Sequence, residues 1–235
     1  MRPYPCELEH EILWPDGVTC RVRPIRPDDG PRLLAFHHGL SARSAHMRFF
    51  TNHPELSPAE VERFTHVDYD DRLALVVEHD GALVAVARYD RLPDTSEAEV
   101  AFVVTDEFQH LGIGTLLLDD LAGAALSRGI MTFVASTLAE NHSMLGVFYH
   151  SGYHITSNRD HETVSLRFSI EPDDRTRTAL AARRADGAEH RVAQRAARCG
   201  DDPHRGDRDG PSVPCIQRIS AKGSPRSGGG VSDND

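Results

Sequence analysis

The sequence predicts an α/β fold, in which a mixed, mostly antiparallel sheet with at least one parallel crossover is flanked by helices. Two Asp-Gly dipeptides are each flanked by apolar and β-branched runs, which is typical of β-hairpins. In the second half of the chain, strand-like and helical segments alternate, which favours a parallel connection. The length of 235 residues fits one such domain with an appendage.

The strands of the first half are predicted from these hairpins. Residues 9–14 and 18–23 form the first, and residues 72–79 and 82–89 form the second, which carries the strongest hairpin signal in the chain. Each Asp-Gly pair supplies the positive φ angles that a tight turn requires. Residues 98–105 mix apolar with β-branched side chains and are predicted to form a further strand.

Three helix starts are predicted between the two hairpins from their capping residues. Asp28 is a candidate N-cap for a helix that carries Leu33, and Ser41 is a candidate N-cap for a short second helix. The segment from Ser57 to Glu60 is a capping box with proline at the first helical position, so a third helix is predicted to begin there.

The second half alternates helix and strand. Residues 115–128 are predicted to be helical, because leucines recur at helical spacing and Gly129 follows where a left-handed cap belongs. The elements after it are a strand at 131–137, a helix at 141–148 that Gly152 ends, and closing strands at 153–157 and 163–169.

Composition divides the chain into a domain of residues 1–170 and a low-complexity tail of residues 171–235. The tail has no aromatic residue, and its 11 Arg and 1 Lys nearly balance its 9 Asp and 2 Glu, so the acidic excess lies in the domain. A segment this poor in apolar residues cannot bury enough surface to offset its chain entropy. We expect the tail to be disordered, with one marginal helix within residues 178–198.

Charge and spacing narrow the class of protein. A formal net charge of −10 argues against a basic nucleic-acid-binding face. The apolar runs are far shorter than the roughly 20 residues that cross a bilayer, and no apolar signal segment opens the chain. The 14 His and 4 Cys lack metal-ligand spacing. We therefore expect a cytoplasmic protein that binds no membrane, nucleic acid or metal.

The turn Gln109-His110-Leu111-Gly112-Ile113-Gly114 is the main candidate for a ligand site. It joins a strand to the helix that begins near Thr115, and its glycines permit backbone angles closed to other residues. The unpaired N–H groups and the positive dipole end of that helix favour a phosphate or pyrophosphate. The turn lacks the lysine of a Walker A loop and the glycine spacing of the dinucleotide fingerprint. Plain turn chemistry is the alternative.

At this point the chain resembles a known family. The strand from Glu99 to Val104, the turn QHLGIG and the leucine-rich helix resemble the acetyl-CoA-binding motif of the GNAT (Gcn5-related) N-acetyltransferases, and the segment from Asn141 to Tyr153 resembles their second motif. The stretches VRPIRPDD, RFF and ERFTHVDYDDRLALVV resemble the acetyltransferase domain of actinobacterial Pat-type protein lysine acetyltransferases. The resemblance spans roughly residues 10–169 and implies the GNAT fold.

The resemblance also implies a cofactor site. Backbone amides of the turn would hold the pyrophosphate of coenzyme A, and the strand before it would pair with the pantetheine arm while one of its amides polarises the thioester carbonyl. The expected cofactor-binding residues are Phe102, Val103, Val104, Gln109, His110, Leu111, Gly112, Ile113, Gly114, Thr115 and Asn141.

Glu99 is the candidate general base. A lysine ammonium, with a pKa near 10.4, is neutral only about once in 2,500 at pH 7, so a carboxylate that accepts its proton is needed. The apolar neighbours Ala98 and Val100 predict partial desolvation of Glu99, and a glutamate at the matching position serves as base in the Pat-like group. A plain solvent-facing charge is the alternative.

Two further positions concern the chemistry. Asn141 is a good N-cap, and the family often has an asparagine here that contacts cofactor or substrate, so Asn141 is also a candidate catalytic residue. Many GNAT enzymes have a tyrosine general acid where this chain has Phe148, and the neighbouring Tyr149 would point roughly 100° away on a helix. No side-chain acid is therefore predicted for the leaving thiolate.

The resemblance implies an N-acetyltransferase in which an amine attacks acetyl-CoA directly. A protein lysine is the expected acceptor, for example on an acyl-CoA synthetase-like protein. The alternatives are a GNAT enzyme that acts on a small-molecule amine or a protein N-terminus, and a non-catalytic acyl-CoA-binding or sensor module. We expect residues 40–56 and 90–97 and the closing strands to form the acceptor pocket.

Overall fold

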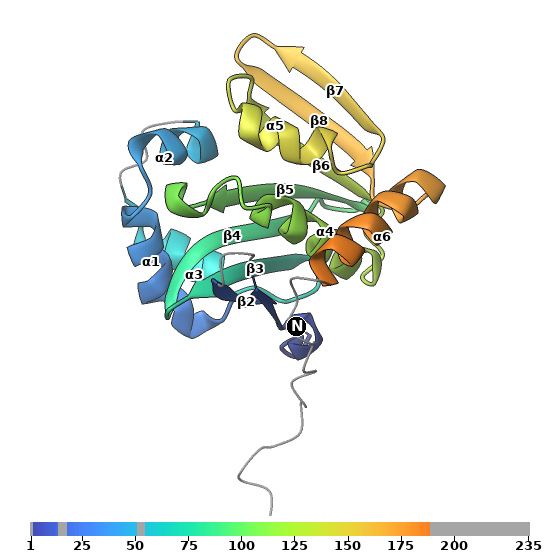
Figure 1. The fold of residues 1–235 in the computed structure, drawn as a ribbon. Coiled ribbons are helices and arrows are strands. Elements are labelled where there is room, and N and C mark those ends of the chain that lie inside the picture. Colours follow the sequence, from blue (N-terminus) through green and yellow to red (C-terminus); the bar gives the residue numbers. More distant parts are fainter. Residues whose placement is uncertain (1, 14–17, 51–54, 189–235) are drawn as a thin grey trace, which may run out of the picture. The chain divides into compact units, whose positions relative to one another are not determined.

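The computed structural model describes residues 2–13, 18–50 and 55–188 (Figure 1). Most of the predicted tail and the turn of the first predicted hairpin lie outside these residues. The elements, in chain order, are η1 (Cys6–Leu8), β1 (His10–Leu13), β2 (Thr19–Pro24), η2 (Pro27–Asp29), α1 (Gly30–His38), α2 (Ala42–Phe49), α3 (Pro58–Thr65), β3 (Arg72–His79), β4 (Ala82–Arg91), β5 (Glu97–Val104), η3 (Asp106–Phe108), α4 (Ile113–Leu126), β6 (Thr132–Leu138), α5 (His142–Tyr149), β7 (Ile155–Asp160), β8 (Thr163–Ser169) and α6 (Asp174–Ala188).

The strands form one sheet in the order β1-β2-β3-β4-β5-β6-β8-β7. All neighbouring pairs are antiparallel except β5 and β6, which are parallel and are joined through α4. The predicted mixed, mostly antiparallel sheet with a parallel crossover is confirmed. None of the helices in the described ranges is long and apolar enough to cross a membrane.

The parallel pair is short and opens into a fork. It comprises three residue pairs, which join Glu97 to Thr132, Ala98 to Phe133 and Glu99 to Val134. From residue 100 to residue 104, β5 pairs with β4 alone among the described strands, while β6 stays paired with β8 over its whole length. Backbone groups along one edge of β5 therefore lack a strand partner beyond Glu99, and α5 lies at the opening (Figure 1).

The core packs around the two central strands, β3 and β4, whose middle residues are buried. Helix α4 contacts β3, β4 and β5 through fully buried leucines, and α1 contacts β4 and α3. Burial of these leucines stabilises the fold, since each contributes roughly 1.5–3 kcal/mol when fully buried. The arrangement fixes the end of β5 relative to α4, and the candidate site lies there.

Most predicted capping residues are confirmed. Ser41 accepts a hydrogen bond from the Ser44 amide at 3.1 Å, and Ser57 and Glu60 form the capping box of α3. Gly129 has the left-handed φ of 74° predicted for the end of α4, although α4 begins at Ile113, two residues before the predicted start.

The predicted cap at Asp28 is wrong. Helix α1 follows a 3-10 turn and has Asp29 at its N-cap position, without a side-chain cap. The Asp29 carboxylate instead accepts two hydrogen bonds at 2.7 Å from Arg23, and both side chains are buried. A buried ion pair needs this geometry, because either charge alone would carry a large desolvation cost.

Helix α6 begins earlier than the marginal helix predicted in the tail, and it packs on the domain. Arg183 donates two hydrogen bonds of 2.9 Å to Asp119 of α4, and the Thr176 hydroxyl donates to the Gly152 carbonyl at 3.1 Å. Gly152 has a φ of 89°, and a Cβ there would lie 2.8 Å from the Ala179 Cβ. These contacts extend beyond residue 170, where composition places the boundary.

Candidate active site

A cleft of about 590 Å³ lies between the end of β5, the turn before α4 and the helices α2 and α5. It brings together nearly all the residues expected to bind the cofactor. The predicted residues that line it are Phe102, Val103, Val104, Gln109, His110, Gly112, Ile113, Gly114, Thr115 and Asn141. Leu111 is absent from the lining and is exposed.

The two glycines of the turn have different functions in the structure. Gly112 has a φ of 81°, as a left-handed turn position requires, whereas Gly114 is helical. Gly114 is needed for close packing, because a Cβ there would lie 3.0 Å from the Val147 side chain of α5. Among the described residues, no side chain caps α4, so its first N–H groups are available to an anion in the cleft.

Helix α2 is attached to this turn by side-chain hydrogen bonds. Gln109 donates from its amide nitrogen to the Ser44 hydroxyl and to the Val104 carbonyl, both at 3.0 Å. Asp106 accepts from the hydroxyls of Ser41 and Ser44 at 2.9 Å. Burial alone would raise the pKa of Asp106, but these hydrogen bonds outweigh it and hold the pKa below its usual range.

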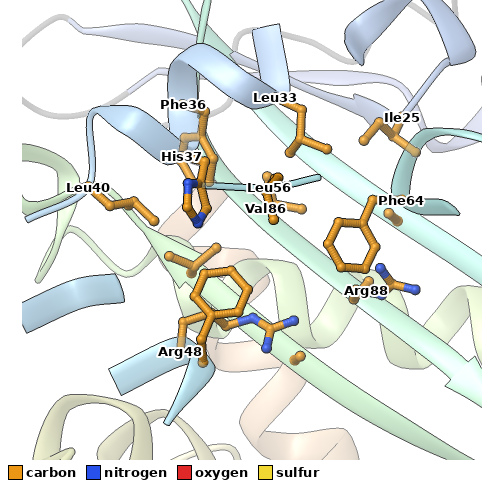
Figure 2. A pocket seen from close by; sticks show the side chains of 14 residues that line it. Ile25, Leu33, Phe36, His37, Leu40, Arg48, Leu56, Phe64, Val86 and Arg88 are labelled. Carbon is orange, nitrogen blue, oxygen red and sulfur yellow. The ribbon is translucent and has the colours of Figure 1, made fainter. Parts of the chain in front are cut away.

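A second, smaller cavity of about 40 Å³ lies beneath α1, α2 and α3 (Figure 2). Its walls are mostly apolar, with three basic side chains, His37, Arg48 and Arg88. Arg88 donates two hydrogen bonds, of 2.7 and 2.8 Å, to the carboxylate of Asp90. Its guanidinium lies 4.6 Å from the centre of the Phe64 ring.

Arg48 differs from Arg88 in its surroundings. It lies in the last turn of α2, and it lines both the cleft and the smaller cavity. Burial and the neighbouring charge of Arg88 lower the pKa of Arg48 to about 10, against the attraction of Glu99 and Asp90. The guanidinium therefore stays charged at neutral pH.

Glu99 is the last residue of β5 that pairs with β6, so it lies where the fork opens. Side chains alternate along a strand, which puts Glu99 on the same face as Ala101 and Val103 of the smaller cavity. Glu99 is exposed and lines neither cavity, so the partial desolvation expected from its neighbours is absent. Within the described residues, its carboxylate makes no hydrogen bond or ion pair.

The structure also places the remaining predicted positions. Asn141 caps α5 by accepting from the Met144 amide at 3.1 Å, and it lines the cleft as well. Phe148 is 1% exposed and packs with Phe102 and Phe168, at ring-centre distances of 5.9 and 5.7 Å. Tyr149 is 50% exposed and lines neither cavity.

Sequence reasoning missed much of the cleft wall. Arg43, Ser44, Met47 and Arg48 were expected only as part of the segment 40–56. The residues that were not expected at all are Asp106, Phe108, Glu140, His142, Ser143, Met144, Gly146, Val147 and His150. The predicted segment 40–56 contributes lining residues to both cavities, whereas residues 90–97 line neither. The described ranges also contain no cluster of three potential metal ligands.

Comparison with known proteins agrees with this arrangement. A model of the acetyltransferase (GNAT) family matches residues 40–153. The acetyltransferase PA5475 of Pseudomonas aeruginosa is 31% identical over 133 residues, which make up 55% of this chain and 72% of that protein. The acetyltransferase Pat of Mycolicibacterium smegmatis is 32% identical over 131 residues, which make up 54% of this chain and 39% of that protein.

A solved structure is similar over most of the described residues. The GNAT domain of S. lividans PAT is 39% identical, with a TM-score of 0.67, and the match covers 71% of this chain and 99% of that domain. The cleft at the forked strands, the glycine-containing turn and these similarities agree with one another. The chain therefore belongs to the GNAT acetyltransferase family and is an acetyl-CoA-dependent N-acetyltransferase.

Proposed function

We propose that this enzyme acetylates the ε-amine of a protein lysine and that Glu99 is its general base. The role of Glu99 as general base is supported by its position at the opening of the fork. A carboxylate there would face the incoming amine, while the free edge of the same strand would hold the thioester. Exposure of Glu99 also leaves its carboxylate open to an incoming amine or to a bridging water.

The reaction needs one proton acceptor and a polarised carbonyl. The amine lone pair attacks the carbonyl carbon, and the π electrons of the C=O bond move to oxygen. When the C=O bond forms again, the C–S bond breaks and coenzyme A leaves as a thiolate. Glu99 first takes the proton of the lysine ammonium, directly or through water, and releases it to solvent. It then takes the second proton from the nitrogen of the tetrahedral intermediate, and that proton reaches the thiolate through water.

Backbone groups are proposed to hold acetyl-CoA. The N–H groups of residues 110–115 would bind the pyrophosphate, and the free edge of β5 from Phe102 to Val104 would pair with the pantetheine arm. Asn141 would contact the cofactor or the acceptor in addition to capping α5, since it lines the cleft.

The acceptor class rests on similarity to Pat-type enzymes. Protein lysine is proposed on that ground, and an acyl-CoA synthetase-like protein is a suitable first acceptor to test. Polyamines and peptides with a free N-terminus are the competing acceptors, and a measured preference for either would replace lysine in the proposal. A cytoplasmic site of action is part of the same proposal.

The test compares Glu99→Gln with Glu97→Gln. Glu97 lies two residues away on the same strand, but it pairs with Arg167 and lines neither cavity. We expect Glu99→Gln to lower kcat by about 10²–10⁴-fold, with the Kd for acetyl-CoA unchanged in calorimetry. Glu97→Gln should behave as the unmodified enzyme. Full turnover in Glu99→Gln would exclude Glu99 as the base.

A further inference from the structure

Of the described residues, two line both the cleft and the smaller cavity, namely Arg48 and Val103. Val103 belongs to the strand edge that is proposed to hold the pantetheine arm. The side chain of Val103 also lies on the same face of the sheet as Glu99, because side chains alternate along a strand. Arg48 therefore brings a positive charge to the boundary between the cleft proposed for acetyl-CoA and the cavity on the Glu99 face of the sheet.

Among the described residues, no neighbour accepts a hydrogen bond from Arg48. Its guanidinium has no carboxylate of these residues within 4.0 Å, and it lies 5.0 Å from the centre of the Phe49 ring. Arg88, by contrast, gives two of its hydrogen bonds to Asp90. Figure 2 shows that both side chains reach the cavity, Arg48 from α2 and Arg88 from β4.

The helix that carries Arg48 is also anchored to the rest of the site. Helix α2 is held at its start by the Ser41 and Ser44 contacts with Asp106 and Gln109. These contacts attach the helix to the same turn that is proposed to bind pyrophosphate. A donor that is held in place and partly shielded from water stabilises charge more effectively than a mobile, solvated one.

We propose that Arg48 is a catalytic residue that donates a hydrogen bond to the thioester carbonyl oxygen of acetyl-CoA. This inference rests on the proposed function. As the amine attacks, the carbonyl π electrons move to that oxygen, and the guanidinium stabilises the resulting negative charge. The guanidinium remains protonated throughout, so the proton of the amine still leaves through Glu99 or water and the sulfur still leaves as a thiolate.

The test uses Arg48→Gln and Arg48→Lys, with Arg63→Gln as the matched control. Arg63 is an exposed arginine in the last turn of the neighbouring helix α3, and it lines neither cavity. We expect Arg48→Gln to lower kcat by about 10²–10³-fold, as loss of one oxyanion donor does. Arg48→Lys should recover part of that loss, and Arg63→Gln should have normal turnover. The Kd for acetyl-CoA should rise by no more than about tenfold in the two Arg48 variants, as loss of one hydrogen bond predicts, and should be unchanged in Arg63→Gln.

A second measurement needs no turnover. The infrared band of the thioester carbonyl, recorded with acetyl-CoA labelled with ¹³C at that carbon, reports how strongly the bound carbonyl is polarised. The spectrum is recorded without an acceptor. We expect the band to lie at a lower frequency in the unmodified enzyme than in Arg48→Gln. Equal frequencies, or a loss of turnover in Arg63→Gln equal to that in Arg48→Gln, would overturn the inference. Absence of any acetyl-CoA binding would contradict the proposed function itself.

Discussion

The Asp106 carboxylate accepts a hydrogen bond from the Ser44 hydroxyl at 2.9 Å, although the two residues are 62 positions apart in the sequence. With Gln109, which also donates to Ser44, this contact joins the turn before α4 to helix α2. Arg48, in the last turn of α2, lines both cavities. The segment proposed to bind pyrophosphate is therefore connected to the wall that the two cavities share.

The first prediction concerns this connection. Asp106→Ala should lower the free energy of unfolding by about 1 kcal/mol, the usual net contribution of an intramolecular hydrogen bond. It should also lower kcat/KM for the acceptor by roughly tenfold, because helix α2 loses its anchor and a 1.4 kcal/mol change in transition-state binding corresponds to that factor. Chemical denaturation and steady-state kinetics measure the two effects.

Asp173→Ala is the matched control for Asp106. Asp173 accepts a hydrogen bond from the Thr176 amide at 2.7 Å at the start of α6 and lines neither cavity. The Asp173→Ala variant should lose about as much free energy of unfolding as Asp106→Ala, but its kcat/KM should be normal. An equal loss of activity in both variants would mean that Asp106 acts on stability alone.

The second prediction concerns Gly152. Gly152→Ala should destabilise the fold for two reasons: its φ of 89° is strained for alanine, at about 1–2 kcal/mol, and the new Cβ would overlap the Ala179 Cβ. Ala179→Gly removes the overlap but not the strain. The loss of free energy of unfolding caused by Gly152→Ala should therefore be smaller, by at least about 1 kcal/mol, in a chain that also carries Ala179→Gly. Urea unfolding of the single and double variants measures this difference. Additive effects would argue against close packing between Gly152 and α6.

The third prediction concerns helix α6. A chain that ends after Ile170 should melt about 5 °C lower than the full chain, since it loses the bond between Arg183 and Asp119 and the buried Thr176. About 2 kcal/mol corresponds to such a shift in a domain of this size. A chain that ends after Ala188 should melt as the full chain does, as composition predicts for the remainder. Thermal denaturation of the three chains decides between these outcomes.

The fourth prediction is a pH dependence. Although burial alone would raise the pKa of Asp29, hydrogen bonds from Arg23 and Arg26 hold it below its usual range. The ionised carboxylate therefore stabilises the fold above the unfolded-state pKa of about 4, and this contribution disappears as pH falls through the lower folded-state pKa. Asp29→Asn should cost about 3 kcal/mol at pH 7.

The difference in free energy of unfolding between Asp29→Asn and the unmodified enzyme should shrink steadily below about pH 4. Urea unfolding at several pH values between 2 and 7 measures it. A difference that stays constant across this range would mean that the ionisation of Asp29 contributes nothing to stability.

Several features could be predicted from the sequence because their causes are local. The Asp80-Gly81 turn, the capping box of Ser57 and the left-handed Gly129 each follow from the backbone preferences of one to four residues. The glycine-containing turn and the helix after it likewise favour the anion site proposed there, through their own N–H groups. The sequence by itself thus determined the two hairpins, the parallel crossover and the position of the glycine-containing turn.

Tertiary structure decided the features that depend on partners distant in sequence. Asp29 pairs with Arg23 instead of capping α1, and Gly114 is small because Val147 of another helix lies against it. Arg48 reaches both cavities because Asp106 holds α2 against the turn. Such contacts arise only when remote segments pack together, and the free energy of burying or pairing their side chains then outweighs the local preferences that a sequence reveals.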